Sequence, residues 1–171
     1  GDGELYGKSK YQYDEDGNNT EKTWYSTLDG GKWKAQYDED GNNTEKTWYG
    51  TNGELYGKYK YQYDEDGNMT EETWNWEGYA ELKFGGGKPN YYSGKIRYQY
   101  DEDGNETEMS DYNADGELKG KYKYQYDEDG NMTEETSYTA DGELEEKYKY
   151  QYEFDKLNNW IVRTRYEDDT P

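Results

Sequence analysis

The octapeptide YQYDEDGN at residues 124–131 decides the fold, because the chain copies it along its length. Unchanged copies begin at Tyr11, Tyr61 and Tyr98, residues 35–42 repeat it with alanine first, and residues 152–159 are a divergent sixth copy. Successive copies from the first to the fifth lie 24, 26, 37 and 26 residues apart. A unit repeated at a period of this length predicts a repeat array, in which each unit packs on its neighbours.

Each copy is expected to join two strands into a hairpin. In residues 121–126, tyrosine alternates with lysine or glutamine, which places the tyrosines on one side of a strand. Residues 127–130, Asp-Glu-Asp-Gly, are typical of a type I turn that ends in a glycine of positive φ. Residues 131–138 then form a threonine-rich second strand, and the turn pattern returns at 139–142, 113–116 and 50–53. The sequence therefore predicts a succession of antiparallel strands.

The turn also predicts a register, in which Asp127 faces Asn131. Two cross-strand rows follow: Lys123–Glu135–Lys147 on the polar side and Tyr126–Met132–Tyr150 on the tyrosine side. The second row implies that the register slips by two residues per hairpin, and a sheet with steady stagger coils or closes. We therefore expect an all-β fold. It is a tandem β-hairpin repeat array, an antiparallel meander that forms a coiled single sheet or a β-solenoid or open-barrel-like structure with a tyrosine-rich packed face.

We expect one repeat domain over residues 1–171. Its hairpin units are about 1–26, 27–50, 51–75, 97–113 and 114–139, with an irregular insertion at 76–96 and a C-terminal cap at 140–171. The insertion contains GGGKPN at residues 85–90, a run of chain-breaking residues that could divide the array into two halves. The cap has Asn158 where other copies have glycine, and it places apolar residues on both faces of its last strand, as is typical of terminal repeats.

Charge and composition limit the classes of partner. The chain has 20 Lys and Arg residues against 41 Asp and Glu residues, a formal net charge of −21. Because this charge repels phosphate backbones and anionic bilayers, we expect no nucleic-acid partner and no membrane insertion. Hydrophobic residues make up only 29% of the chain, but 24 tyrosines and six tryptophans supply large rings for packing. There is no cysteine, so aromatic packing has to replace disulfides as well as an aliphatic core.

The pairing of Tyr-x-Tyr-Asp-x-x-Gly-Asn with a threonine-rich strand and a second Asp-Gly turn resembles the YD (Tyr-Asp) repeats of the RHS superfamily. The resemblance depends on the six copies and covers nearly the whole chain except about residues 76–96. It implies a spiralling sheet of tandem hairpins and, as in related short bacterial arrays, export to the cell surface. The chain has too few units to enclose a cargo, and it lacks the family's self-cleaving C-terminal signature and a toxin segment. The near identity of the copies also fits a consensus-engineered array.

Two motifs in the turns suggest chemistry and also have simpler explanations. Residues 14–18, Asp-Glu-Asp-Gly-Asn, resemble the opening of a calcium loop, but the twelfth position of an EF-hand that begins there is Tyr25. We interpret these segments as hairpin turns and expect no cofactor or ordered metal, with at most weak, diffuse divalent cation binding. Candidate glycosylation sites of the form Asn-x-Thr occur at Asn18, Asn42, Asn68, Asn105 and Asn131. The same pattern arises wherever a turn-favouring asparagine precedes a strand-favouring threonine.

Three tryptophans, Trp24, Trp48 and Trp74, occupy one repeat position. Strict alternation places them beside Lys22, Lys46 and Glu72 on the polar side, away from the tyrosine rows. An aromatic stripe on a charged face is a candidate contact surface for sugar rings or for another protein. Alternatively, the rings lie over lysine stems or are covered by the 76–96 segment. Because the chain has no histidine and no cysteine, and no glycine-rich phosphate loop follows an apolar strand, we expect no enzymatic activity.

The sequence therefore predicts a non-catalytic structural or adhesive repeat module outside the cell, secreted or on the cell surface, that serves as a stalk, spacer or filament subunit. Self-association through the free edges of the strands at 8–13 and 160–166, or binding to glycans, would give it partners. Four basic residues would oppose edge pairing: Lys8, Lys10, Arg163 and Arg165. Two alternatives stay open. One is a carbohydrate-binding module that uses the tryptophan stripe, and the other is an engineered repeat scaffold without a natural ligand.

Overall fold

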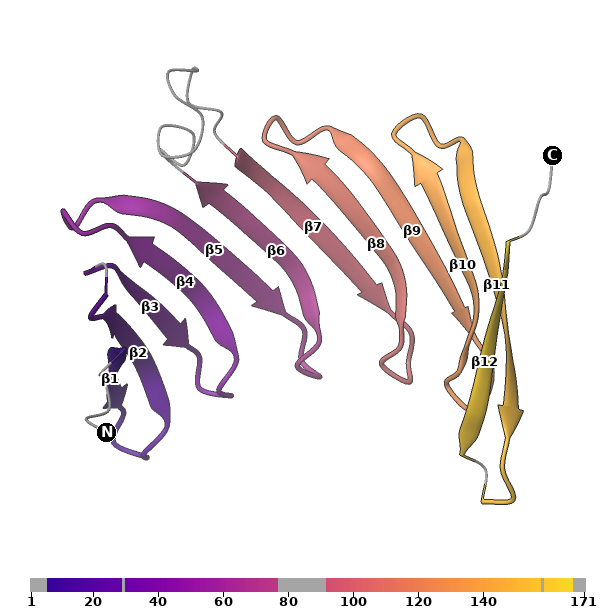
Figure 1. The fold of residues 1–171 in the computed structure, drawn as a ribbon, viewed down its shortest axis with the longest axis horizontal. Helices are drawn as coiled ribbons and strands as arrows, with labels where there is room; N and C mark the ends of the chain where they lie inside the picture. Colours follow the sequence, from indigo (N-terminus) through magenta and orange to yellow (C-terminus); the bar gives the residue numbers. More distant parts are fainter. Residues whose placement is uncertain (1–5, 29, 77–91, 158, 168–171) are drawn as a thin grey trace. The chain divides into compact units, whose positions relative to one another are not determined.

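The chain is all-β, and its twelve antiparallel strands form one meander sheet, β1 to β12 in sequence order, that is not closed (Figure 1). The computed structural model describes residues 6–28, 30–76, 92–157 and 159–167. The first six strands are β1 (Gly7–Tyr13), β2 (Asn19–Ser26), β3 (Lys32–Tyr37), β4 (Asn43–Tyr49), β5 (Leu55–Tyr63) and β6 (Met69–Trp76). The other six are β7 (Tyr92–Tyr100), β8 (Glu106–Asn113), β9 (Leu118–Tyr126), β10 (Met132–Thr139), β11 (Leu144–Phe154) and β12 (Trp160–Glu167).

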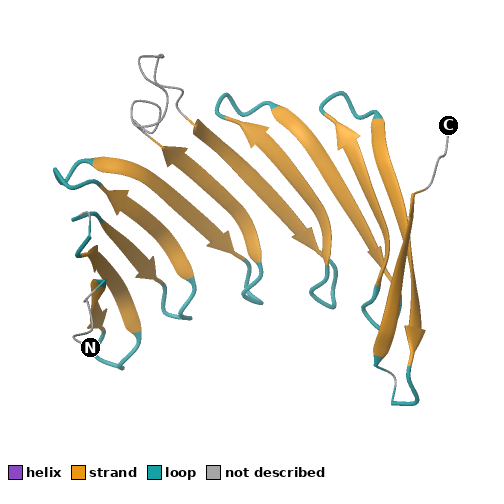
Figure 2. Cartoon of the chain, in the orientation of Figure 1, coloured by secondary structure: helices purple, strands orange, loops and turns teal. Residues whose placement is uncertain are grey.

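The strands belong to two compact units, Gly1–Lys95 and Ile96–Pro171, whose boundary falls within β7. The first unit contains β1 to β6, and the second contains β8 to β12. In both units strands alternate with short loops, and helices do not appear among the described residues (Figure 2). The predicted insertion lies mostly outside the described residues, as does Asn158 in the predicted cap.

The predicted turns are confirmed. Gly130 has a φ of 79°, in the left-handed region that glycine adopts without a steric penalty. Its N–H donates to the Asp127 carbonyl at 3.1 Å, and the Asp127 N–H donates to the Asn131 carbonyl at 2.9 Å. The Asp127 carboxylate accepts from the backbone of Asn131 at 2.8 Å, so a single side chain fixes the turn. The other predicted turns repeat this glycine geometry at Gly116, Gly142 and Gly53.

A β-bulge after the turn corrects the predicted register of the second strand. Met132 pairs with Tyr126 as predicted, but the next pair is Glu134 with Gln125, so Thr133 has no partner in the register. This extra residue moves every later side chain of β10 to the opposite face. The predicted row Lys123–Glu135–Lys147 is therefore wrong: the observed row is Lys123–Thr136–Lys147.

The tyrosine-side row changes for the same reason. Glu135 faces Tyr124 on β9 and Tyr148 on β11, so it lies with the tyrosines. Because Glu134 pairs with Lys149, Met132 does not lie opposite Tyr150 as predicted; instead, its carbonyl accepts a hydrogen bond from the Tyr152 hydroxyl at 2.9 Å. A slip of two residues is observed at β10, since Thr136 faces Lys123 on one side and, on the other, the residue that matches Lys121 in the next repeat. The first hairpin does not slip, because Thr23 faces Lys10 and Lys34, which occupy the same repeat position.

The face that carries the lysines, here the polar face, has a repeated hydrogen-bonded ladder. At its centre lies a row of buried hydroxyl residues, Thr23, Thr47, Ser110 and Thr136, each 4–5% exposed. Each hydroxyl donates to the glutamate two residues earlier, and that glutamate pairs with a lysine on the next strand at 2.7–2.9 Å: Glu21–Lys34, Glu45–Lys58, Glu108–Lys121 and Glu134–Lys147. The same strand junction thus occurs four times among the described residues, and Glu71–Lys95, at 3.7 Å, is a longer fifth pair at the same repeat position.

On the face that carries the tyrosines, here the aromatic face, the side chains pack mainly against neighbouring side chains of the same face. Ala35 and Tyr150 are the only buried hydrophobic residues among those described. Most other rings are half-buried and lie against neighbouring rings, as Tyr59 does against Tyr61 with centroids 6.1 Å apart. Each such cross-strand or same-face contact contributes roughly 0.2–1 kcal/mol, and repetition along the array supplies what an aliphatic core does elsewhere.

The last strand, β12, differs from the inner strands in its exposure. Every described side chain of β12 is exposed, including the apolar residues Trp160, Ile161 and Val162, which agrees with the apolar content expected of the cap. Arg165 lies over the Tyr148 ring at 4.3 Å and Arg163 over the Tyr150 ring at 5.3 Å. The arginines therefore cover the last tyrosines of the aromatic face with positive charge.

Candidate ligand-binding surface

The bulge also corrects the predicted position of the tryptophans. Trp24 faces Ser9 on β1, two residues from the pair of Lys22 with Tyr11, so Trp24 and Lys22 both lie on the aromatic face. Trp48 packs against Tyr59 with ring centroids 5.3 Å apart, and Trp74 packs against the same tyrosine at 6.5 Å. The prediction that these tryptophans lie beside lysine or glutamate is correct, but the prediction that they lie on the polar face is wrong.

Sequence reasoning missed two further tryptophans of this surface. Trp33 faces Trp24 on β2 and Trp48 on β4, which makes an unbroken row across three strands. The Trp24 and Trp33 rings stack with centroids 6.5 Å apart and an interplanar angle of 18°. Trp76 extends the row on β6, where its ring lies 5.1 Å from that of Trp48. The signal for Trp33 was its alignment with Tyr59 in the lysine-tyrosine strand pattern.

Glycines leave the space that these rings occupy. Gly57 lies between Trp48 and Trp76 in the cross-strand row. A Cβ atom at Gly57 would come within 2.4 Å of the Trp76 ring, and one at Gly7 would come within 2.7 Å of the Trp24 ring. The tryptophans therefore lie flat across glycine backbone at both positions, and the row depends on the absence of a side chain there.

Two lysines lie between the rings. The Lys22 ammonium lies 5.3 Å from the centroid of Tyr11 and 5.4 Å from that of Trp33. The Lys46 ammonium lies 4.8 Å from Trp33 and 4.9 Å from Trp48. Both distances are those of cation–π contacts, so the two ammonium groups flank one indole ring. We call this set the aromatic–lysine patch: Tyr11, Lys22, Trp24, Trp33, Lys46 and Trp48.

Ala35 occupies the centre of the patch. It pairs directly with Lys22 on β2 and with Lys46 on β4, and it is 1% exposed. In the unchanged copies of the octapeptide this position is a tyrosine, such as Tyr61. Replacing that ring by a methyl group lets the two lysine stems approach each other over β3.

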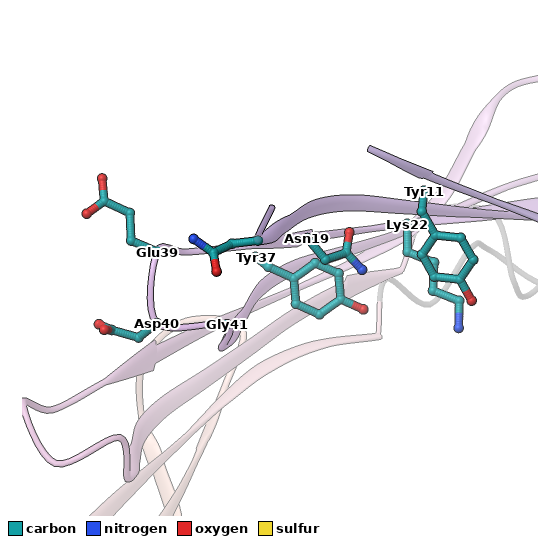
Figure 3. A pocket seen from close by; sticks show the side chains of 8 residues that line it. Tyr11, Asn19, Lys22, Tyr37, Glu39, Asp40 and Gly41 are labelled. Carbon is teal, nitrogen blue, oxygen red and sulfur yellow. The ribbon is translucent and has the colours of Figure 1, made fainter. Parts of the chain in front are cut away.

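A hollow of about 360 Å³ adjoins the patch near the turn between β3 and β4. Its lining includes Tyr11 and Lys22 from the patch, with Tyr37 and Asn19 beside them. Figure 3 shows the two tyrosine rings and Lys22 together, while the carboxylates of Glu39 and Asp40 extend from the turn away from the rings. The Asn19 Oδ1 atom is buried and accepts no hydrogen bond from the described residues. The hollow is therefore lined by two rings, one cation and, at the turn, two acidic residues.

The aromatic face has the opposite charge at the next repeat. Glu72 faces Tyr61 there, at the positions that correspond to Lys46 and Ala35. Burial raises the pKa of Glu72, because the fold removes the carboxylate from water. Burial, followed by the charge of Glu72, raises the pKa of Tyr61 to about 12. The positive charge is thus confined to the patch on β2 and β4 and does not continue onto β6.

The candidate glycosylation sites all lie directly after a turn. The side-chain amide of each asparagine donates to the aspartate that opens the turn, in the pairs Asn18–Asp14, Asn42–Asp38, Asn68–Asp64, Asn105–Asp101 and Asn131–Asp127. The threonine of the motif is the bulge residue, and at Thr44 and Thr107 its hydroxyl donates to a carbonyl of the preceding strand. Turn and bulge geometry therefore explain why both residue types recur, whatever the modification state of the asparagine.

Acidic residues do not converge on a metal site in the described part of the chain: no group of three or more carboxylates there could hold an ion. The turn carboxylates are engaged by backbone instead. Hydrogen bonds from the Asn68 backbone lower the pKa of Asp64, and those from the Asn131 backbone lower the pKa of Asp127. The residues that the structure describes also contain no helix with the length and apolar character needed to cross a bilayer.

Comparison with known proteins adds little to this geometry. A scan of protein-family models finds no match, and a search of curated protein sequences finds none either. Among solved structures, the chain is similar to a crystal structure of a protein of unknown function from Bacteroides fragilis, with 17% sequence identity over 82% of this chain and 94% of that one. The TM-score of this pair is 0.29.

Proposed function

We propose that this chain is a non-catalytic structural or adhesive repeat module that works outside the cell as a stalk or spacer. The observation that supports this proposal is the repetition of one strand junction, the buried hydroxyl with its glutamate–lysine pair. Because each junction is the same, hairpins can be added to or removed from the middle of the array while its terminal strands stay the same. The number of repeats then determines the length of the module. The resemblance to YD repeats supports the same location and role.

The terminal strand favours a stalk or spacer over a filament subunit. At the inner junctions the second strand of a hairpin supplies a glutamate, such as Glu45, to a lysine on the next strand. The corresponding residue of β12 is Val162, with Arg163 and Arg165 close by in the sequence. A second copy that docked its β1 here, in the register of β5 on β4, would place Lys10 opposite Val162 and Lys8 opposite Thr164, with no carboxylate for either lysine. Charges of this kind on an edge strand oppose edge-to-edge pairing.

Location and oligomeric state test this proposal. Antibody labelling of intact source cells, with labelling of lysed cells as the control, should detect the chain at the surface or in the medium. Light scattering across a wide range of protein concentration should give the mass of a single chain. Detection only after lysis would contradict the extracellular role. A mass that grows with protein concentration would favour the filament subunit over the stalk or spacer.

A second candidate function is carbohydrate binding, and the row Trp24–Trp33–Trp48 favours it. Half-buried indole rings in a row offer flat apolar surface with polar groups at the edges, which suits the faces of sugar rings. A glycan array should give signals that Trp33→Ala and Trp48→Ala abolish, while Trp160→Ala, on the exposed terminal strand, leaves them unchanged. An array without any signal would contradict this function.

A further inference from the structure

We propose that the aromatic–lysine patch binds a short acidic oligosaccharide, with one hexuronate ring stacked on the indoles and its carboxylate held between Lys22 and Lys46. This inference rests on the second candidate function, carbohydrate binding, and specifies the chemical class of the sugar. The argument depends on three properties of the patch, namely unpaired positive charge, the absence of a ring at residue 35 and a flat aromatic surface.

The first property is that these two lysines have no carboxylate partner among the described residues. Lysines of the polar face such as Lys34 and Lys58 are paired with glutamates at 2.7 and 2.9 Å. The ammonium groups of Lys22 and Lys46 contact only aromatic rings instead. In a chain where acids outnumber bases two to one, two adjacent cations without counter-charge are the site best suited to an anion.

The second property is the absence of a ring at Ala35, a residue that is 1% exposed. The corresponding Tyr61 of the third hairpin has a phenol ring that covers the sheet and faces Glu72, a carboxylate. At Ala35 the ring is absent and both neighbours are lysines. The first two hairpins therefore differ from the repeat consensus at three positions, all of which favour an anion over β3.

The third property is the aromatic surface next to these charges. Trp33 lies between the two ammonium groups, and its stack with Trp24 widens the apolar platform. The adjoining hollow is lined by Tyr11 and Lys22 on the side of the patch, and by the acidic residues Glu39 and Asp40 at the turn. A sugar ring with one carboxylate matches the cations and the platform together, whereas a simple carboxylate or a neutral sugar matches only one of the two.

The charge of the whole molecule limits the length of the ligand. The net charge of −21 repels a long polyanion at a distance. At physiological ionic strength this repulsion is screened beyond about 8 Å, so the local lysines dominate for a ligand of a few sugar units. We therefore assign the patch to a short uronate-containing segment and not to an extended acidic polymer.

The test compares trigalacturonate with its methyl ester, which keeps the rings and hydroxyls but removes the charge. Binding is measured by titration calorimetry and by quenching of tryptophan fluorescence. We expect the acid to bind about 5-fold or more tightly than the ester, the ratio that corresponds to a charge contact of ~1 kcal/mol. Lys22→Gln and Lys46→Gln should each weaken binding of the acid by a similar factor and leave binding of the ester unchanged.

Two further variants complete the design. Lys60→Gln, an exposed lysine on the polar face of β5, is the matched control and should not alter binding. Ala35→Tyr restores the consensus ring and should weaken binding of the acid, with far-ultraviolet circular dichroism used to check that the variant folds. Equal binding of acid and ester, with no effect of the lysine variants, would overturn this inference and leave carbohydrate binding intact. Absence of binding by both ligands would also overturn it, and glycan-array signals for other sugars would then decide the candidate function separately.

Discussion

Trp76 lies flat across Gly57, so closely that a Cβ atom at residue 57 would come within 2.4 Å of the indole ring. Gly57 faces Trp48 on β4 and Trp76 on β6, and the two indole rings meet over it with centroids 5.1 Å apart. The glycine is therefore required by side-chain packing. Its place in the cross-strand row explains why the tyrosine-lysine alternation stops at the start of β5.

Gly57→Ala should destabilise the protein by about 1–3 kcal/mol, because the added methyl group overpacks the space under Trp76. Urea unfolding followed by tryptophan fluorescence measures the change. In the double variant Gly57→Ala with Trp76→Leu the smaller side chain removes the clash, so the two changes should be less destabilising together than their sum. Additive effects would show that the ring does not rest on the glycine.

The turns and first strands could be predicted because their patterns have a single physical meaning. In residues 121–126 only one parity is aromatic, which fixes the face, and the sequence of residues 127–130 fixes the turn. Gly130 and Asp127 have the predicted geometry to the residue. The sequence was sufficient to predict the turn and the aromatic face wherever one residue type at a position was compatible with only one conformation or one face.

The faces of the second strands could not be predicted, because their residues do not differ by parity. Residues 131–138, NMTEETSY, carry polar side chains at both odd and even positions, so the pattern itself could not show that a bulge at Thr133 had exchanged the faces. Trp24 and Tyr25 present the same difficulty, with an aromatic ring on each face. The error for the tryptophans, and the omission of Trp33 from the candidate site, follow from the equivalent unpaired threonines of the first two hairpins, Thr20 and Thr44.

The turn aspartates make the fold sensitive to acid. Hydrogen bonds from the Asn131 backbone, and then from its side chain, hold the pKa of Asp127 below its ordinary value of 3.8. Because the folded-state pKa is the lower one, this stabilisation is fully present above pH 3.8 and is lost as the pH falls through the folded-state pKa. Asp127→Asn should therefore cost stability at pH 7, by less than about 1 kcal/mol at this exposed turn, and the cost should shrink in acid.

Thermal unfolding of wild type and Asp127→Asn between pH 2 and 7 measures this difference. Glu128→Gln, at the next position of the same turn, is the control for removing one negative charge. A difference between wild type and Asp127→Asn that stays constant over the whole range would show that the carboxylate charge does not stabilise the turn.

Tyr61 makes the fold sensitive to alkali as well. Its pKa is raised from 10.0 to about 12, first by burial and then by the charge of Glu72. The unfolded chain loses this proton near pH 10 while the folded chain retains it, so the contribution to stability is complete below pH 10 and declines as the pH rises toward 12. In Tyr61→Phe this decline should be shallower, as measured by urea unfolding at several pH values. Tyr11→Phe, on the exposed first strand, is the control, and equal slopes for wild type and Tyr61→Phe would contradict the prediction.

Val162 should control whether copies of the chain join end to end. The inner junctions pair a glutamate at this repeat position with a lysine of the next strand, as Glu45 pairs with Lys58. The residue of β1 that corresponds to Lys58 is Lys8, which is exposed. Val162→Glu therefore supplies the carboxylate that β12 lacks, and β1 of a second copy can then pair with β12 as β5 pairs with β4.

Light scattering of Val162→Glu should show a mass that rises with protein concentration, whereas wild type and Val162→Gln stay at the mass of one chain. Adding Lys8→Glu to Val162→Glu should return the mass to that of one chain, because two carboxylates would then face each other at the junction. High salt should also weaken the association, since the pair is exposed to solvent. If Val162→Gln associates as strongly as Val162→Glu, the polarity of the edge and not the glutamate–lysine pair controls strand addition, and the junction would not have the ionic basis that its four inner copies indicate.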